Sequence, residues 1–223
     1  MINTETDTIT WKETNHGRTM SEALIELKRN NFFQGKRILE LGGGIANHTI
    51  IMLENHPELL VTTEINEERL EVTRGRVGEH FTNKEQPCCE FRVADWLDTH
   101  GTFDVVITNP PYFMSGKYNR RYFIDELILN SHRSLNPDGY LIFVQSSMAD
   151  IDITKSRMEE NGFTFEVLHQ KSYPWRDYYF QDPRFLKMCD ENPKSHFLKN
   201  GERWETLFVV HGKLLEFDTK FTH

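Results

Sequence analysis

The sequence lacks the features that mark several protein classes. Among its 223 residues only three are cysteines; Cys88 and Cys89 are adjacent, and Cys189 stands alone. Neighbouring cysteines rarely pair and no CxxC spacing occurs, so we expect neither a disulfide framework nor a zinc site. The ten histidines form neither HxxxH nor HxH. These absences predict that no metal is bound and favour the reducing cytoplasm.

Long apolar runs and an excess of positive charge are also missing. No run approaches the roughly 18–20 apolar residues of a membrane-spanning helix, and the first residues, MINTETDTITWKETN, show no charged-then-apolar leader. The formal net charge of −8 gives no global basic footprint for nucleic acid, although a local basic patch remains open. With 38% hydrophobic and 27% charged residues, the chain is expected to form one soluble domain with a modest insertion.

Apolar strand-like segments alternate with amphipathic helical segments along the chain. We expect strands at 36–42, 59–65, 89–96, 103–109, 139–148, 163–173 and 205–217. We expect helices at 18–32, 45–56, 66–81, 119–135 and 153–162. This alternation predicts an α/β protein whose parallel sheet is covered on both faces. The long connection 174–204 is aromatic and charged, which is typical of a lid or an insertion.

The first predicted strand runs into a glycine turn, LELGGGIANH (39–48). Such a turn lets the backbone approach a ligand closely, and the following helix adds free N–H groups. Gly42 and Gly44 fill the first two positions of the dinucleotide pattern G-x-G-x-x-G, but Asn47 stands at the third. That departure weakens the hypothesis that the protein is a nicotinamide-dependent oxidoreductase. Glu64 ends the second strand, where a carboxylate can accept both ribose hydroxyls.

The fourth predicted strand ends in ITNPPY (107–112). Successive prolines have fixed φ angles and donate no hydrogen bond, so they form a rigid exit with free carbonyls. The Asn109 side chain and the Pro110 carbonyl can each accept one N–H of an NH₂ group and orient its lone pair. The Tyr112 ring can stack on a planar amide or base and stabilise growing positive charge. We therefore expect Asn109, Pro110 and Tyr112 to be catalytic.

These motifs in this order resemble class I S-adenosylmethionine-dependent methyltransferases of the NPPY amino-methyltransferase group. The resemblance covers roughly 35–170 and departs from the group at Ala46, where many members have a glycine. It implies a seven-stranded, mostly parallel Rossmann-like sheet with an antiparallel last strand, and S-adenosyl-L-methionine as the cofactor. Glu40 would help to fix the methionine part, and Asp95 would bind the adenine amino group. The implied cofactor-binding residues are Glu40, Gly42, Gly44, Glu64, Ile65, Asp95, Trp96 and Asn109.

The NPPY motif does not identify the methyl acceptor. The chain is similar to release-factor glutamine N5-methyltransferases and to N6-adenine methyltransferases, and both substrates present a planar NH₂. The net charge disfavours a polyanion, so an amide or amine of a protein, peptide or small molecule is preferred over adenine in RNA or DNA. A helical segment at 1–35 is expected over the cofactor site, and 36–223 forms the methyltransferase domain. Candidate substrate residues are Pro111, Arg120, Trp175 and Arg176.

Two further classes of function compete with this interpretation. A nicotinamide-dependent oxidoreductase is disfavoured by Asn47, and a non-catalytic binding module has no need of the complete acidic and NPPY motifs. The sequence shows no heptad pattern, and the oligomeric state stays undecided.

Overall fold

An eight-stranded mixed sheet forms the centre of the protein. The computed structural model describes residues 14–82, 88–110 and 121–215. The strand order is β3-β2-β1-β4-β5-β8-β6, with β7 paired to β8 beside this path. The strands are β1 Arg37–Leu41, β2 Leu59–Glu64, β3 Cys89–Val93, β4 Phe103–Thr108, β5 Leu135–Ser146, β6 Glu166–Pro174, β7 Phe197–Lys199 and β8 Glu202–Lys213.

The directions of the strands match the sequence prediction. The pairs among β1 to β5 are parallel, whereas β8 runs antiparallel to both β5 and β6. The expected mostly parallel, Rossmann-like sheet with an antiparallel last strand is therefore confirmed. The three-residue strand β7, which lies within the 174–204 connection, adds an eighth strand that the sequence did not predict.

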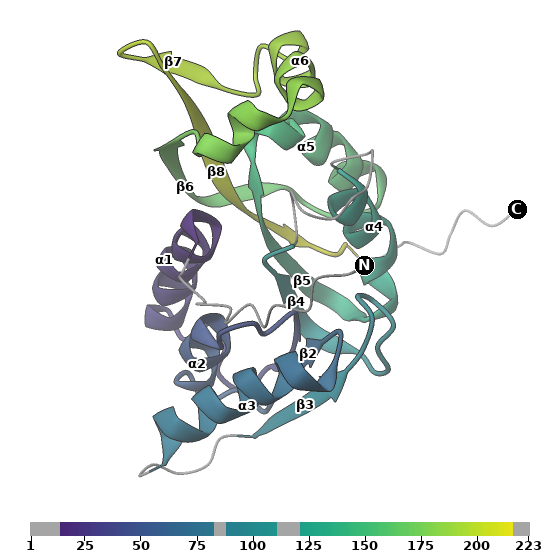
Figure 1. The fold of residues 1–223 in the computed structure, drawn as a ribbon. Helices are drawn as coiled ribbons and strands as arrows, with labels where there is room; N and C mark the ends of the chain where they lie inside the picture. The colour runs from purple at the N-terminus through teal and green to yellow at the C-terminus, as the bar shows by residue number, and fades with distance from the viewer. Residues whose placement is uncertain (1–13, 83–87, 111–120, 216–223) are drawn as a thin grey trace, which may run out of the picture.

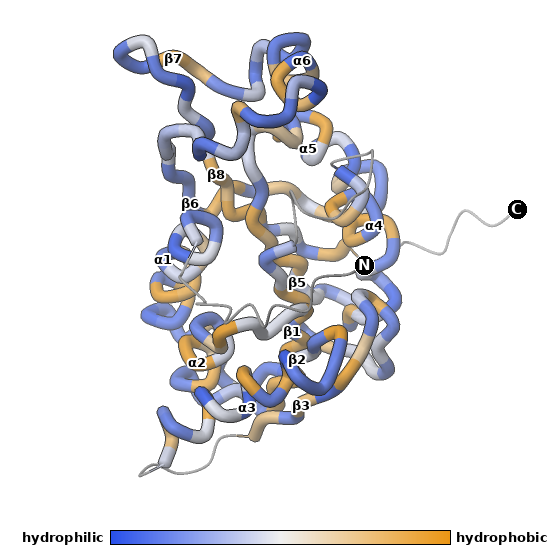
Figure 2. Tube along the Cα trace, in the orientation of Figure 1, coloured by the Kyte–Doolittle hydropathy of each residue, from blue (hydrophilic) through white to orange (hydrophobic). Residues whose placement is uncertain are grey.

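Helices cover both faces of the sheet, as Figure 1 shows. The helices are α1 Asn15–Arg29, α2 Asn47–Leu53, α3 Glu67–Phe81, α4 Tyr122–Asn130, α5 Ile151–Glu160 and α6 Pro183–Glu191. One apolar core joins α1, α2 and α3 to the sheet, and a second joins α4 and α5 to the opposite face. Successive residues of β1 alternate between them, so that Ile38 packs in the first core and Leu39 in the second. Figure 2 shows the apolar colour gathering on the central strands.

Side-chain caps explain where several helices begin. Thr14 accepts a hydrogen bond from the Gly17 amide at the start of α1, and Asn66 accepts one from the Arg69 amide at the start of α3. The helix expected at 119–135 ends earlier, at Asn130, and continues as a short 3₁₀ helix. No helix in the described ranges has the length and apolar character needed to cross a lipid bilayer.

The 174–204 connection is a folded part of the domain. It contains a 3₁₀ helix at Asp177–Gln181 as well as α6 and β7. The Tyr179 hydroxyl donates to Glu205 Oε1 at 3.1 Å, and the Ser147 hydroxyl donates to the Ser195 carbonyl at 2.6 Å. Its buried aromatic side chains join the core beneath α4 and α5. The interpretation of 174–204 as an insertion that acts as a lid stays a prediction.

Candidate functional site

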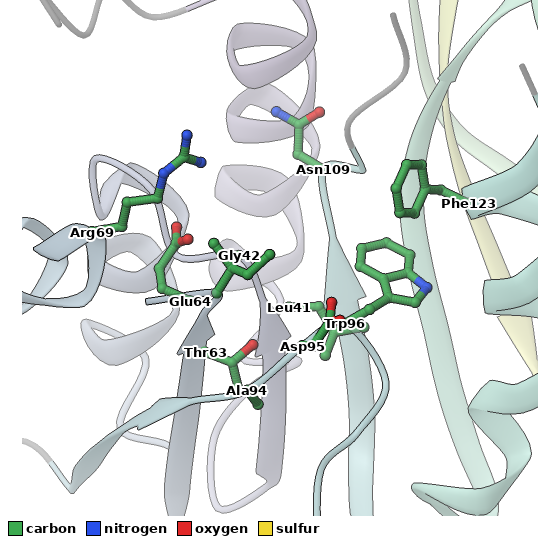
Figure 3. A pocket seen from close by; sticks show the side chains of 11 residues that line it. Leu41, Gly42, Thr63, Glu64, Arg69, Ala94, Asp95, Trp96, Asn109 and Phe123 are labelled. Carbon is green, nitrogen blue, oxygen red and sulfur yellow. The ribbon is translucent and has the colours of Figure 1, made fainter. Parts of the chain in front are cut away.

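The carboxyl ends of β1 to β4 enclose a cavity of about 310 Å³. Its walls are formed by Leu41, Gly42, Thr63, Glu64, Ile65, Arg69, Ala94, Asp95, Trp96, Asn109 and Phe123. Figure 3 shows Glu64 and Arg69 on one side of Gly42, Trp96 and Phe123 on the other, and Asn109 at the end of β4. Parallel strands bring these residues together because their carboxyl ends meet at one sheet edge. The residues come from six separate segments of the chain.

The glycine turn gives the cavity an open floor. Gly42 has a φ of 80° and Gly44 a φ of 53°, a region that side-chain-bearing residues rarely adopt, and a Cβ at either would meet nothing within 4 Å. Gly43 has the opposite constraint: its Cβ would lie 2.3 Å from Thr62 Oγ1 and 2.8 Å from Thr73 Cγ2. Gly43 is therefore the glycine that permits close packing of the turn against β2 and α3. The sequence interpretation missed this role.

Ala46 takes a conformation that normally favours glycine. It is fully buried and caps α2 with a φ of 61° and a ψ of 10°, without a side-chain cap. The left-handed conformation costs an alanine roughly 1–2 kcal/mol. Ala46 therefore holds the turn at a cost in backbone energy that a glycine would avoid.

Glu64 ties the glycine turn to the end of β2. Its Oε1 accepts a hydrogen bond from the Gly44 amide at 2.7 Å, while the Gly44 carbonyl accepts one from Thr73 Oγ1 at 2.8 Å. Glu64 is buried yet lines the cavity. Its second carboxylate oxygen makes no hydrogen bond within the described ranges and is left to accept one from a ligand.

Glu40 lies behind the turn and does not line this cavity. Its Oε2 accepts hydrogen bonds from Thr49 Oγ1 at 2.6 Å and Thr62 Oγ1 at 2.9 Å. Its Oε1 is buried without a hydrogen-bond partner in the described part of the chain. Burial raises the pKa of Glu40 to about 7, against the opposing effect of the two threonine hydrogen bonds. Through these two hydrogen bonds Glu40, on β1, links α2 to β2.

An apolar wall faces Glu64 across the cavity. The Trp96 and Phe123 rings meet edge to face, with centroids 5.1 Å apart and planes at 71°. Ile65, which also lines the cavity, leaves 58% of its surface exposed. Asp95 lies between β3 and Trp96, so a carboxylate stands beside the aromatic rings. Phe123 was not predicted from the sequence, because its position depends on how α4 packs.

Asn109 and Pro110 follow β4 directly. The strand end is fixed by Thr108, whose hydroxyl donates to the Leu41 carbonyl at 2.9 Å. Asn109 is half-buried and lines the cavity, and its side-chain amide makes no hydrogen bond to any residue of the described ranges. Pro110 is buried. The other predicted residues of this segment, Pro111, Tyr112 and Arg120, lie outside the described residues.

Trp175 and Arg176 are not part of the cavity wall. Trp175 is 6% exposed and packs against Tyr179 and Phe185 inside the insertion, with centroid distances of 5.9 Å and 5.6 Å. Arg176 donates to the Tyr178 hydroxyl at 3.0 Å. Its positive charge also contributes, after burial, to a lowered pKa of His16. Trp175 therefore builds the insertion, whereas Arg176 places a cation beside α1.

No group of three or more histidine, cysteine, aspartate or glutamate side chains in the described ranges is arranged to hold a metal ion. The two carboxylates that line the cavity, Glu64 and Asp95, can accept hydrogen bonds. They therefore favour an organic ligand that carries hydroxyl and amino groups. Glycine provides the floor and aromatic rings one wall.

Residues 11–173 match the methyltransferase small domain family. The chain belongs to this family. It is an enzyme of the class I methyltransferase type, and S-adenosylmethionine is its cofactor. No curated protein sequence matches the chain.

Solved methyltransferase structures share the fold. The E. cuniculi Mtq2–Trm112 complex, described as responsible for methylation of the eRF1 translation termination factor, matches with a TM-score of 0.59 and 20% identity over 91% of this chain and 97% of the other. The T. thermophilus 16S rRNA N2 G1207 methyltransferase RsmC, solved with AdoMet and guanosine, matches with a TM-score of 0.60 and 15% identity over 92% of this chain and 44% of the other.

A ribosomal protein L11 methylase from Lactobacillus delbrueckii subsp. bulgaricus has a TM-score of 0.55 and 14% identity, covering 87% of this chain and 78% of its own. At these identities the similarities show a common fold.

Proposed function

We propose that this enzyme transfers a methyl group to an amide or amine nitrogen that Asn109 and Pro110 hold at the cavity. The observation that carries the proposal is the position of Asn109, which lines the same cavity as Gly42, Glu64 and Asp95. The nearby NPPY sequence supports membership of the amino-methyltransferase group. Both the nitrogen as the methylated atom and the class of acceptor molecule are part of what we propose.

The residues of the cavity suit S-adenosylmethionine. Gly42 and Gly44 leave open space above the turn, and one oxygen of Glu64 is available to accept a ribose hydroxyl. Asp95 lines the cavity together with Ile65 and Trp96, so that its carboxylate can accept a hydrogen bond from an adenine amino group. The bound cofactor supplies an electrophilic methyl group.

Methyl transfer then depends on how the protein orients the acceptor. The Asn109 side-chain oxygen and the Pro110 carbonyl each accept one N–H, which directs the nitrogen lone pair into the cavity. The nitrogen held in this way would accept the methyl group that the bound cofactor supplies and would release its proton to solvent. Tyr112, beyond the described residues, is proposed to cover the nitrogen and stabilise its positive charge. No protein nucleophile is required.

We propose a protein, peptide or small molecule as the acceptor. The net charge of −8 disfavours a polyanionic partner, and the Mtq2–Trm112 relative acts on a protein. Arg176 and Arg120 remain candidates to bind an acceptor carboxylate, and Pro111 remains a candidate substrate contact. Trp175 would act through the packing of the insertion. Methylation of adenine in RNA or DNA is the alternative.

The helix α1 supports the proposed role of the 1–35 segment beside the cofactor. His48, in the first turn of α2 after the glycine turn, is 3.0 Å through Nε2 from the Gly17 carbonyl of α1. Thr19 of the same helix lies 3.1 Å, through its hydroxyl, from the Tyr173 hydroxyl at the end of β6. Helix α1 thus contacts both α2, which follows the glycine turn, and the end of β6, which precedes the insertion.

Labelled S-adenosylmethionine added to a cell extract with the enzyme tests the acceptor class. We expect label in protein or small molecules, and label confined to RNA or DNA would replace the preferred acceptor with adenine.

Asn109→Ala should lower turnover at least about tenfold while changing cofactor affinity little. Asn130→Ala, at the far end of α4, is the matched control. Equal loss of turnover and affinity would mean that Asn109 holds the cofactor instead.

A further inference from the structure

We infer that Arg121 is a positioning residue for the acceptor clamp, by which we mean Asn109 and Pro110. The inference rests on the proposed function, in which this clamp orients the nitrogen that is methylated. Arg121 is the first described residue after the 111–120 segment that follows the clamp, and it stands at the start of α4. Its side chain ties that end of the segment to the end of β5, the strand beside the clamp.

Hydrogen-bond acceptors surround the Arg121 guanidinium, and the side chain is only 13% exposed. Its Nη1 donates to the carbonyls of Ala149 and Asp150, the second at 3.1 Å, and to Thr154 Oγ1 at 3.0 Å. Its Nε and Nη2 both donate to Asp125 Oδ1, at 3.2 Å and 2.8 Å, one turn further along α4. The planar guanidinium therefore joins the start of α4 to the connection between β5 and α5 in a geometry that a lysine could not reproduce.

The connection that Arg121 binds has an unusual backbone. Asp150 has a φ of 59° and a ψ of 102°, which is rare for a residue with a side chain and persists where the surroundings determine the conformation. The Asp150 side chain caps α5 by accepting hydrogen bonds from the Asp152 and Ile153 amides. Arg121 binds the carbonyl of Asp150 and that of Ala149 just before it. The bend is thus fixed from both the α4 and the α5 side.

Thr154 extends this network to the end of β5. Its hydroxyl accepts from Arg121 and donates to Gln145 Oε1 at 2.7 Å. Thr154 is fully buried and Gln145 is 1% exposed. Gln145 Nε2 is buried and makes no hydrogen bond to any residue of the described ranges. The hydrogen bond from Thr154 therefore sets the orientation of the Gln145 side chain.

The register of the sheet brings the network to the clamp. Thr108 of β4 pairs with Phe143 of β5, so continuing this parallel register by two residues places Pro110 beside Gln145. Arg121 reaches the same glutamine through the threonine hydroxyl. Both borders of the segment that follows the clamp are therefore tied to the end of β5. Because a misplacement of about 1 Å can cost a large factor in rate, this second anchor contributes to the precise orientation of the acceptor nitrogen.

Transfer of label from S-adenosylmethionine in the cell extract measures the effect on turnover. With saturating cofactor and excess extract, Arg121→Ala should lower the maximal rate at least about tenfold, and Arg121→Lys should have a smaller effect. Calorimetry should show an affinity for S-adenosylhomocysteine within about twofold of the wild type, because Arg121 does not line the cavity.

Three comparisons separate positioning from a general loss of stability. Thr154→Val cuts the link to β5 while keeping the side-chain shape, so it should lower the rate about fivefold and keeps the inference testable if Arg121→Ala folds poorly. Asn136→Ala removes a hydrogen bond of 2.9 Å to Asp104 at the opposite end of β4 and β5, and should leave the rate unchanged. In an Asn109→Ala background, Arg121→Ala should have little further effect, because the group that it positions is already missing.

The outcomes distinguish this inference from the proposed function. If the wild type transfers label but Arg121→Ala and Thr154→Val keep its maximal rate, the inference is wrong and the proposed function stands. Equal losses of rate and cofactor affinity, or full additivity with Asn109→Ala, would also overturn the inference. If the wild type transfers no label to any component of the extract, the proposed function is wrong and the inference falls with it.

Discussion

Replacing Glu40 with glutamine should change how the stability of the protein depends on pH. Glu40 is 2% exposed, and both hydrogen bonds that it receives, from Thr49 and Thr62, end on Oε2. Burial raises its pKa from 4.5 to about 7. The folded state therefore retains a proton on Glu40 in a pH range in which the unfolded chain has released it.

The sign and size of the effect follow from this shift. Because the folded pKa lies above the unfolded value, the contribution of Glu40 to stability is fully present below pH 4.5 and is lost as the pH rises through about 7. At about 1.4 kcal/mol per pKa unit, the loss in unfolding free energy is on the order of 3 kcal/mol. Glutamine does not titrate, so Glu40→Gln should lack this loss.

Urea unfolding at pH 4.5 and pH 8 measures the effect. The unfolding free energy of the variant minus that of the wild type should increase by roughly 3 kcal/mol between the two pH values. An amide nitrogen in place of Oε1 adds a cost that is the same at both pH values and cancels. Glu26→Gln, whose side chain is 64% exposed, is the control. The reasoning would be refuted if the difference in unfolding free energy between variant and wild type were the same at both pH values, or if the wild type became relatively more stable at pH 8.

Two other predictions concern packing and a buried hydrogen bond. Gly43→Ala should lower the unfolding free energy by about 1–3 kcal/mol, because its Cβ would lie 2.3 Å from Thr62 Oγ1, whereas Gly75→Ala in α3 meets nothing within 4 Å and should raise it by about 0.5–1 kcal/mol. Thermal unfolding followed by circular dichroism checks both, and equal effects would contradict the packing argument. Tyr179→Phe removes the hydroxyl that donates to buried Glu205, so denaturant unfolding should show a loss of about 1–3 kcal/mol; an unchanged midpoint would contradict this.

Sequence patterns predicted the parts of the site that lie on the ends of strands. Gly42, Glu64, Asp95 and Asn109 each follow a recognisable apolar strand, and the parallel arrangement brings such positions to one edge. Their convergence could therefore be expected without coordinates. Their roles in binding and catalysis remain predictions that the experiments above address.

Positions that depend on packing between elements could not be predicted in the same way. Phe123 and Arg69 reach the cavity because of how α4 and α3 lie against the sheet, which periodicity within one helix does not specify. The need for glycine at Gly43 depends on atoms of β2 and α3 that become neighbours only in the fold. Trp175 could equally have lined a pocket, since an aromatic residue in an insertion has the same sequence signature in either position.

The insertion held one signal that the sequence analysis passed over. Asp182 and Pro183 are a typical start of a helix, and the Asp182 side chain accepts hydrogen bonds from the Arg184 and Phe185 amides at the beginning of α6. The helix has only nine residues, which is too short for periodicity alone to indicate it. Its amphipathic character becomes evident once Phe185 and Cys189 are seen in the core.

The most direct test of the central claim is a calorimetric comparison of S-adenosylmethionine with NADH on the wild type and on Asp95→Ala. Cofactor binding in the cavity predicts heat with S-adenosylmethionine, about tenfold weaker affinity in the variant, and no heat with NADH. No heat from S-adenosylmethionine at near-millimolar concentration, or an affinity that is the same in Asp95→Ala, would contradict the assignment of this cavity as the cofactor site.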